Sequence, residues 1–122
     1  MKNWQLLVVE DDPDGREVVG RILRYHRIPF NATANAEDAL QMLDSQECTG
    51  VIIDLNLPGM DGWSLLGEIK KNPHIAHLPC VAVTAYHSAE LAVKAIEMGF
   101  VAYLPKPFHA TALLRESERV MN

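Results

Sequence analysis

Short apolar runs alternate along the chain with segments in which apolar residues recur at helical spacing. Four runs are continuously apolar, as expected of strands that are buried on both faces of a parallel sheet. They are residues 6–9 (LLVV), 51–53 (VII), 80–83 (CVAV) and 101–104 (VAYL). A weaker and more polar run, residues 29–33 (PFNAT), begins with a proline, which favours the start of an edge strand.

The segments between these runs carry apolar stripes and capping residues typical of helices. Asn35, Asp61 and Ser88 are placed to cap the starts of the second, third and fourth helices, and Gly99 ends the fourth. The first helix starts from Asp12 onward. The stripes are Val18, Val19, Ile22 and Leu23; Ala36, Ala39, Leu40 and Leu43; Trp63, Leu66 and Ile69; Leu91, Ala92, Ala95 and Met98; and Leu113, Leu114, Val120 and Met121. Strands alternating with helices predict one parallel α/β sheet with helices on both faces.

Size, composition and charge narrow the class of protein. The chain has 122 residues, which predicts one domain over residues 1–122, and its 48% hydrophobic fraction suffices for a core. A net charge of −5 argues against a nucleic-acid or membrane partner. The chain shows neither a secretory signal nor an apolar run of membrane-spanning length, and Cys48 and Cys80 lack metal-site spacing. We therefore expect a cytoplasmic protein with reduced thiols.

Polar residues follow the carboxyl ends of four of the five predicted strands. Glu10 and Asp11 follow the first strand, Asp54 ends the third, Thr84 ends the fourth and Lys106 follows the fifth. Parallel strands all point the same way, so these ends share one edge of the sheet, where open α/β sheets bind ligands. We therefore expect acids, a hydroxyl and a lysine to converge there.

Such a cluster has a definite chemistry. Crowded carboxylates raise one another's pKa, and a hard cation such as Mg²⁺ relieves their repulsion. A carboxylate beside Mg²⁺ can accept a phosphoryl group, while Lys106 and Thr84 would supply positive charge and a hydrogen-bond donor. Taken singly, each residue has a plainer interpretation: a turn or cap for the acids, packing for Thr84 and solvation for Lys106. Their coincidence at the strand ends favours the site.

Four segments resemble the receiver domain of two-component response regulators, in particular the single-domain, chemotaxis-regulator-like kind. They are VVEDD at 8–12, VIIDLNLPGMDG at 51–62, VTA at 83–85 and YLPKPF at 103–108. All four occur in order and at the family's spacing, so the likeness covers almost the whole chain. It implies a flavodoxin-like (βα)5 fold whose parallel sheet has the strand order 2-1-3-4-5.

The resemblance also implies a phosphoacceptor and a metal site. Asp54 would take a phosphoryl group from the phosphohistidine of a sensor histidine kinase or a histidine phosphotransfer protein. Glu10 and Asp11 correspond to the acidic pair that holds Mg²⁺, or Mn²⁺ in its place. Asp11 would bind the ion directly and Glu10 through water, with Asp54 binding through its side chain and Asn56 through its backbone carbonyl.

Further residues match the family's switch. Thr84 corresponds to the switch hydroxyl, Tyr103 to the switch aromatic and Lys106 to the family's lysine, which a cis peptide joins to Pro107. For Tyr103 an ordinary core role is an equally good interpretation. Phosphorylation would then change the face formed by the helix from residue 89, the strand at 101–104 and the helix near 113–121.

We expect this face to dock a downstream protein, in a monomer or a weak phosphorylation-dependent dimer, and we expect no separate substrate turnover. Asn56 and Tyr86 should flank the path of the hydrolysing water and tune the lifetime of the phosphoryl group. The residues after Lys106 suffice for one helix. The chain is therefore either a stand-alone receiver or one excised from a longer protein.

Three other classes are weaker. An aspartate-nucleophile phosphatase usually has a second Asp two residues after the nucleophile, where this chain has Asn56. A nucleotide-binding domain would need a glycine-rich loop after the first strand, but residues 10–15 read EDDPDG. A degenerate receiver serving only as a scaffold would not need every chemical position filled, as it is here.

Overall fold

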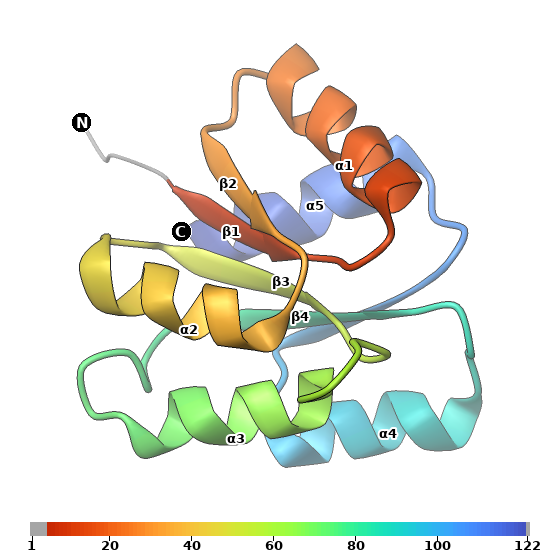
Figure 1. The fold of residues 1–122 in the computed structure, drawn as a ribbon. Helices are drawn as coiled ribbons and strands as arrows, with labels where there is room; N and C mark the ends of the chain where they lie inside the picture. Colours follow the sequence, from red (N-terminus) through yellow and green to blue (C-terminus); the bar gives the residue numbers. More distant parts are fainter. Residues whose placement is uncertain (1–4, 122) are drawn as a thin grey trace.

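The computed structural model describes residues 5–121, with side chains as far as residue 118 (Figure 1). Within this part of the chain, five strands alternate with five helices. The elements are β1 (Leu6–Val9), α1 (Pro13–Tyr25), β2 (Phe30–Thr33), α2 (Ala36–Ser45), β3 (Gly50–Asp54), α3 (Gly62–Lys71), β4 (Cys80–Thr84), α4 (Ala89–Met98), β5 (Ala102–Pro105) and α5 (Ala110–Met121). None of the described helices is long and apolar enough to cross a membrane.

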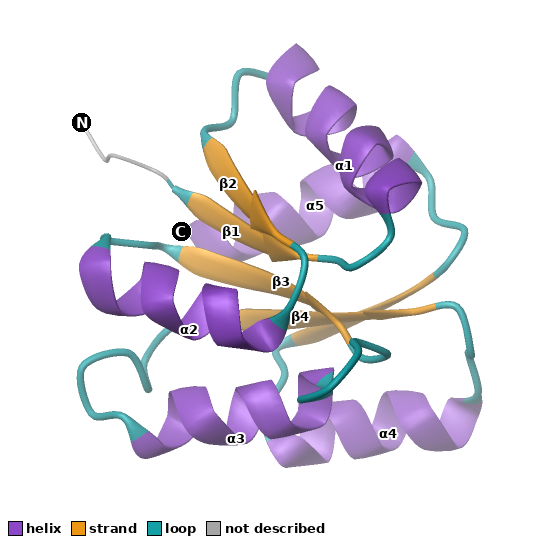
Figure 2. Cartoon of the chain, in the orientation of Figure 1, coloured by secondary structure: helices purple, strands orange, loops and turns teal. Residues whose placement is uncertain are grey.

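The strands form one parallel sheet in the order β2-β1-β3-β4-β5, which confirms the predicted flavodoxin-like fold. Helices α2, α3 and α4 cover one face, and α1 and α5 cover the other (Figure 1). The chain order reverses at β1, which lies between β2 and β3. The loops after β1, β3, β4 and β5 gather at one edge of the sheet (Figure 2).

Alternation within β1 explains why its sequence is apolar throughout. Leu7 and Val9 join the core beneath α2, α3 and α4, whereas Leu6 and Val8 join the core beneath α1 and α5. Successive side chains of a strand point to opposite faces, so a strand covered on both faces needs apolar residues at every position. β5 is an outermost strand of the sheet and is less completely covered, and its Tyr103 is only half-buried.

The helix ends are formed by the residues that the sequence predicts. Asn35, Asp61 and Ser88 each accept a hydrogen bond from the backbone N–H three residues later. Asp12 accepts one from Asp14 and places Pro13 at the first helical position. Gly99 ends α4 with φ of 118°, a left-handed conformation that favours glycine.

Three apolar residues expected in the core are exposed instead. Val18 and Met98 are both more than half exposed, and Val101 precedes β5 rather than beginning it. In α1 the contact with the sheet is made by Val19 and Leu23, and Val18 is rotated about 100° from Val19 around the helix. The side chains of Val120 and Met121 lie outside the described residues.

Candidate functional site

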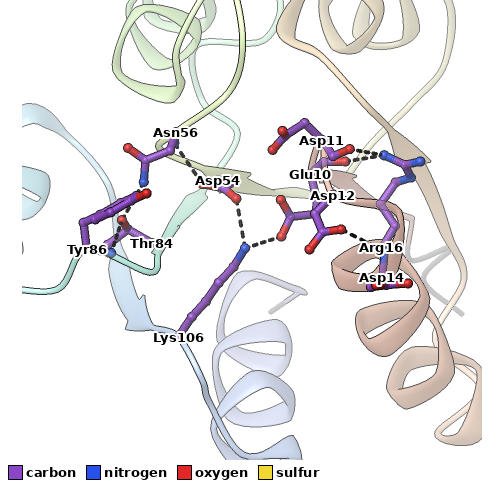
Figure 3. A network of polar contacts seen from close by, with 10 residues as sticks. All are labelled: Glu10, Asp11, Asp12, Asp14, Arg16, Asp54, Asn56, Thr84, Tyr86 and Lys106. Atoms are coloured by element: carbon purple, nitrogen blue, oxygen red, sulfur yellow. Dashed lines mark hydrogen bonds and ion pairs between the residues drawn. The ribbon is translucent and has the colours of Figure 1, made fainter.

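Three carboxylates converge where the strand order reverses. Glu10 follows β1 and Asp54 ends the neighbouring β3, and oxygens of Glu10, Asp11 and Asp54 all lie within 4.8 Å of one another (Figure 3). Glu10 and Asp54 are buried, whereas Asp11 is exposed at the mouth of the cluster. The sheet order thus brings together acids that stand far apart in the sequence, as the pattern of strand ends predicts.

Lys106 reaches this cluster from the end of β5. Its Nζ lies 2.9 Å from Oδ2 of Asp54 and also contacts Oε1 of Glu10 (Figure 3). Its backbone N–H donates to the carbonyl of Thr84, 2.8 Å away, which ties the residue to the neighbouring strand. The peptide bond between Lys106 and Pro107 is cis, the form that the family resemblance implies.

A short chain of hydrogen bonds links Asp54 to Thr84. The backbone N–H of Asn56 donates to Oδ1 of Asp54 (2.8 Å), and its side-chain amide donates to Oγ1 of Thr84 (2.8 Å). The backbone N–H of Tyr86 donates to the same hydroxyl oxygen (3.0 Å). With both lone pairs engaged, the buried Thr84 hydroxyl keeps its proton for an acceptor.

Burial and mutual contact set the ionisation of the cluster. Burial, followed by contact with Asp54, raises the pKa of Glu10 to about 7, against the lowering effect of Lys106. Burial also acts to raise the pKa of Asp54, but hydrogen bonding with Glu10, the Asn56 N–H and Lys106 outweighs it and lowers that pKa. The pKa of Lys106 is raised, because its bonds to the two carboxylates outweigh its burial. Asp54 is therefore the ionised carboxylate at neutral pH.

The donor set suits a hard cation. Oε2 of Glu10 is buried and has no hydrogen-bond partner among the described residues. Carboxylate oxygens are the ligands that Mg²⁺ prefers, and a cation would stabilise the charged form of Glu10, which burial and the contact with Asp54 disfavour. The carboxylates of Glu10, Asp11 and Asp54 therefore fit such an ion.

Tyr103 and the side chain of Tyr86 lie apart from the carboxylates. The Tyr103 hydroxyl lies 3.1 Å from Nδ1 of His87, in the loop between β4 and α4. The Tyr86 side chain is exposed, and its hydrogen bond to Thr84 uses the backbone. Of the predicted site residues, Glu10, Asp11, Asp54, Asn56, Thr84 and Lys106 form one connected cluster.

Sequence analysis missed three residues that shape the site. Arg16 donates to the backbone carbonyls of Glu10 and Asp11 (Figure 3). A Cβ atom at Gly15 would lie 2.7 Å from Oε1 of Glu10, so this carboxylate occupies the space that a side chain would need. His87 contacts Tyr103. No short motif marks these roles, because each depends on where a distant backbone or side chain lies.

A five-stranded sheet with this order and an acid–lysine cluster at its switch point defines the receiver class of signalling domain. Residues 6–118 match the family model described as the response regulator receiver domain, and the chain belongs to this family. Receiver domains of two-component signalling act as phosphorylation-dependent switches rather than as enzymes that turn over a separate substrate. Domains of this family interact with histidine kinases and with downstream partners.

Two of the relatives are bacterial regulators. The response regulator protein FleR of Pseudomonas aeruginosa is 43% identical over 110 residues, which make up 90% of this chain and 23% of FleR. Chemotaxis protein CheY-3 of Vibrio cholerae is 34% identical over 122 residues, covering 98% of this chain and 92% of CheY-3. The chain therefore spans a minor part of one relative and nearly all of the other.

Solved structures agree with this assignment. A CheY-like response regulator receiver domain protein from Methanospirillum hungatei superposes with a TM-score of 0.86 at 26% identity, covering 98% of this chain and 94% of that one. The BeF3-activated DrrB receiver domain superposes with a TM-score of 0.85 at 25% identity, covering 98% of both chains.

Proposed function

We propose that Asp54 accepts a phosphoryl group from the phosphohistidine of a sensor histidine kinase or a histidine phosphotransfer protein. A carboxylate oxygen would attack phosphorus, the phosphorus–nitrogen bond would break, and its electron pair would return to the imidazole. The observation that carries this proposal is the setting of Asp54. This ionised carboxylate is held by Lys106 and the Asn56 N–H beside two further acids.

A divalent cation completes the proposed site. Glu10, Asp11 and Asp54 would hold Mg²⁺, or Mn²⁺ in its place, with the backbone carbonyl of Asn56 as a further ligand. The ion would neutralise charge on the transferred oxygens. The unpartnered Oε2 of Glu10 supports this assignment, since the atom is buried without a hydrogen-bond donor among the described residues.

Lys106 and Thr84 would bind the oxygens of the new phosphoryl group. Nζ of Lys106, now paired with Asp54, would pair with one phosphoryl oxygen, and the free hydroxyl proton of Thr84 would go to another. Any displacement of Thr84 pulls on Tyr86, because the Tyr86 N–H is bonded to its hydroxyl oxygen. The loop after β4 would therefore move with Thr84.

The face formed by α4, β5 and α5 would carry the output. Tyr103 on β5 contacts His87 in the moving loop, so it is placed to follow that movement as the family's switch aromatic. Val93 and Ile96 on α4 are more than half exposed, and exposed apolar residues of this kind suit a protein partner. We place a downstream protein, or a weakly bound second copy, on this face, which leaves the chain monomeric between signals.

Asn56 and Tyr86 would govern how long the phosphoryl group persists. Asn56 is bonded to both Asp54 and Thr84, and the exposed Tyr86 is tied to the Thr84 hydroxyl by its backbone N–H. An amide at position 56 cannot activate water as a second carboxylate would, which argues against an aspartate-nucleophile phosphatase.

Both cysteines are free, in keeping with a reducing cytoplasm as the proposed location.

Intact mass spectrometry with a small phosphodonor tests the assignment. After incubation with phosphoramidate and MgCl2, the wild-type chain should gain one phosphoryl group, and Asp54→Asn should gain none. Asp61→Asn is the matched control, because Asp61 is a nearby acid that caps α3. Labelling of Asp54→Asn at the wild-type level would refute Asp54 as the acceptor.

A further inference from the structure

Arg16 connects the first helix to the loop that carries two of the three carboxylates. Its Nη1 lies 2.8 Å from the carbonyl oxygen of Glu10 and 3.0 Å from that of Asp11 (Figure 3). Arg16 lies in the first turns of α1, so its side chain runs back over the start of the helix. One guanidinium nitrogen thus holds two consecutive carbonyls.

The carbonyl of Glu10 needs this donor because the neighbouring strand β2 ends beside it. The N–H of Glu10 continues the ladder between β1 and β2 by donating to the carbonyl of Thr33, 3.0 Å away. In a parallel ladder the carbonyl of Glu10 would next meet an N–H two residues beyond Thr33. However, β2 ends at Thr33, and Asn35 caps α2 instead. Arg16 supplies the donor that the strand no longer offers.

The direction of the Asp11 side chain depends on this backbone. Asp11 is exposed, so packing does not hold its side chain. The backbone around it is held by the bonds from Arg16 to the carbonyls of Glu10 and Asp11, and by the Arg16 N–H, which donates to the carbonyl of Asp12 (2.9 Å). Fixing the peptide planes on both sides of the Asp11 Cα fixes the direction of its Cα–Cβ bond, and with it the region that its carboxylate can reach.

We propose that Arg16 is a positioning residue for the divalent cation, acting through the backbone of Glu10 and Asp11. This inference rests on the proposed cation site. It gives Arg16 an effect opposite to that of its charge. A guanidinium beside three carboxylates repels a cation, so its removal would tighten metal binding if charge were its only contribution. As a positioning residue, its removal weakens binding.

The experiment titrates MgCl2 into the full chain while the backbone amide shifts of residues 10–12 and 54 are followed by NMR. Arg16→Met keeps a long apolar side chain and removes the donor, and we expect its Mg²⁺ affinity to fall about tenfold, as for other groups that orient metal ligands. Arg16→Lys keeps the charge but ends one bond short of Nη1, so its affinity should lie between those of Arg16→Met and the wild type.

Arg21→Met is the matched control. Arg21 lies on the same helix, is exposed, and pairs with Glu17 at 3.0 Å rather than with the loop. Its loss should leave Mg²⁺ affinity at the wild-type level, although it removes the same charge. The amide spectra without Mg²⁺ report in parallel whether each variant keeps the fold.

Unchanged or tighter Mg²⁺ binding by Arg16→Met would overturn the inference. If Arg16→Met does not fold, Arg16→Lys decides, because wild-type affinity in that variant would overturn it as well. A wild-type chain that binds no Mg²⁺ would remove the cation site and the inference together. One that binds Mg²⁺ but takes no phosphoryl group would refute the proposed phosphotransfer alone, since this titration uses the metal without a phosphodonor.

Discussion

Nζ of Lys106 lies 2.9 Å from Oδ2 of Asp54, although 52 residues separate them in the chain. Asp54 ends β3 and Lys106 follows β5, and β4 lies between these two strands. The lysine side chain is long enough to reach across the end of β4 to Asp54. The same ammonium group also contacts Glu10. The ammonium group of Lys106 therefore holds two buried carboxylates together at the place where a divalent ion is proposed to bind.

Replacing Lys106 by Met should destabilise the metal-free protein. The two carboxylates are almost fully buried, and without the ammonium group the charge of Asp54 is uncompensated. We expect the free energy of unfolding to fall by about 1–3 kcal/mol at pH 7, measured by urea denaturation. Added MgCl2 should restore part of the loss. The control is Lys71→Met, an exposed residue paired with Glu68 at 3.6 Å, and an equal loss in that variant would contradict the prediction.

Mg²⁺ affinity should rise with pH between about 6 and 8. Without metal the pKa of Glu10 is raised to about 7, and the ion requires the carboxylate form, so the metal must displace a proton below that pH. Above it the affinity should level off. The amide-shift titration repeated across this range gives the profile, and Glu10→Gln should flatten it. A wild-type profile that is already flat would argue against this coupling.

The same pKa predicts an opposite trend for metal-free stability. The native state holds the Glu10 proton more tightly than the unfolded chain does, so this contribution is present below pH 4.5 and is lost as the pH rises to about 7. Asp54 contributes in the other direction. Its pKa is lowered on folding, so its contribution is present at neutral pH and is lost as the pH falls through the acid range.

The sequence was sufficient to locate the five strands to within a residue or two and to name the acids, the hydroxyl and the lysine that meet at their ends. Both depend on local patterns and on the rule that parallel strands share an edge. The pattern could not show that Arg16 binds the carbonyl of Glu10, since that contact arises only where β2 ends. Nor could the pattern show that Val18 faces solvent. The helical stripe contains one more apolar residue than the contact with the sheet uses, and the pattern does not indicate which residue is left exposed.

Replacing Thr84 by Ala should uncouple phosphorylation from its response. The side-chain amide of Asn56 and the N–H of Tyr86 would lose their shared acceptor, at a cost of about 1–3 kcal/mol in the free energy of unfolding. Beryllofluoride should still bind at Asp54, but the shifts it causes in α4 amides should shrink. Thr84→Ser keeps the hydroxyl and should behave as the wild type does. Full α4 shifts in Thr84→Ala would contradict the proposed switch.

Two glycines of α3 provide a matched test of how closely its first turn approaches the end of β3. A Cβ atom at Gly62 would lie 2.5 Å from the backbone carbonyl oxygen of Asp54 and 2.7 Å from the Cα of Leu55, whereas a Cβ at Gly67 meets nothing within 4 Å. Backbone atoms cannot give way as a flexible side chain can. Gly62→Ala must therefore push the start of α3 away from the end of β3.

We expect Gly62→Ala to lower the free energy of unfolding by about 1–3 kcal/mol, in the range of other overpacked sites. It should also slow phosphoramidate labelling of Asp54, because the carbonyl it displaces belongs to that residue. Gly67→Ala should instead stabilise the protein by roughly 0.5–1 kcal/mol, the helical advantage of alanine over glycine. Urea denaturation and intact mass compare the two variants. Equal stability and labelling in both would mean that the approach of α3 to Asp54 is looser than the structure has it.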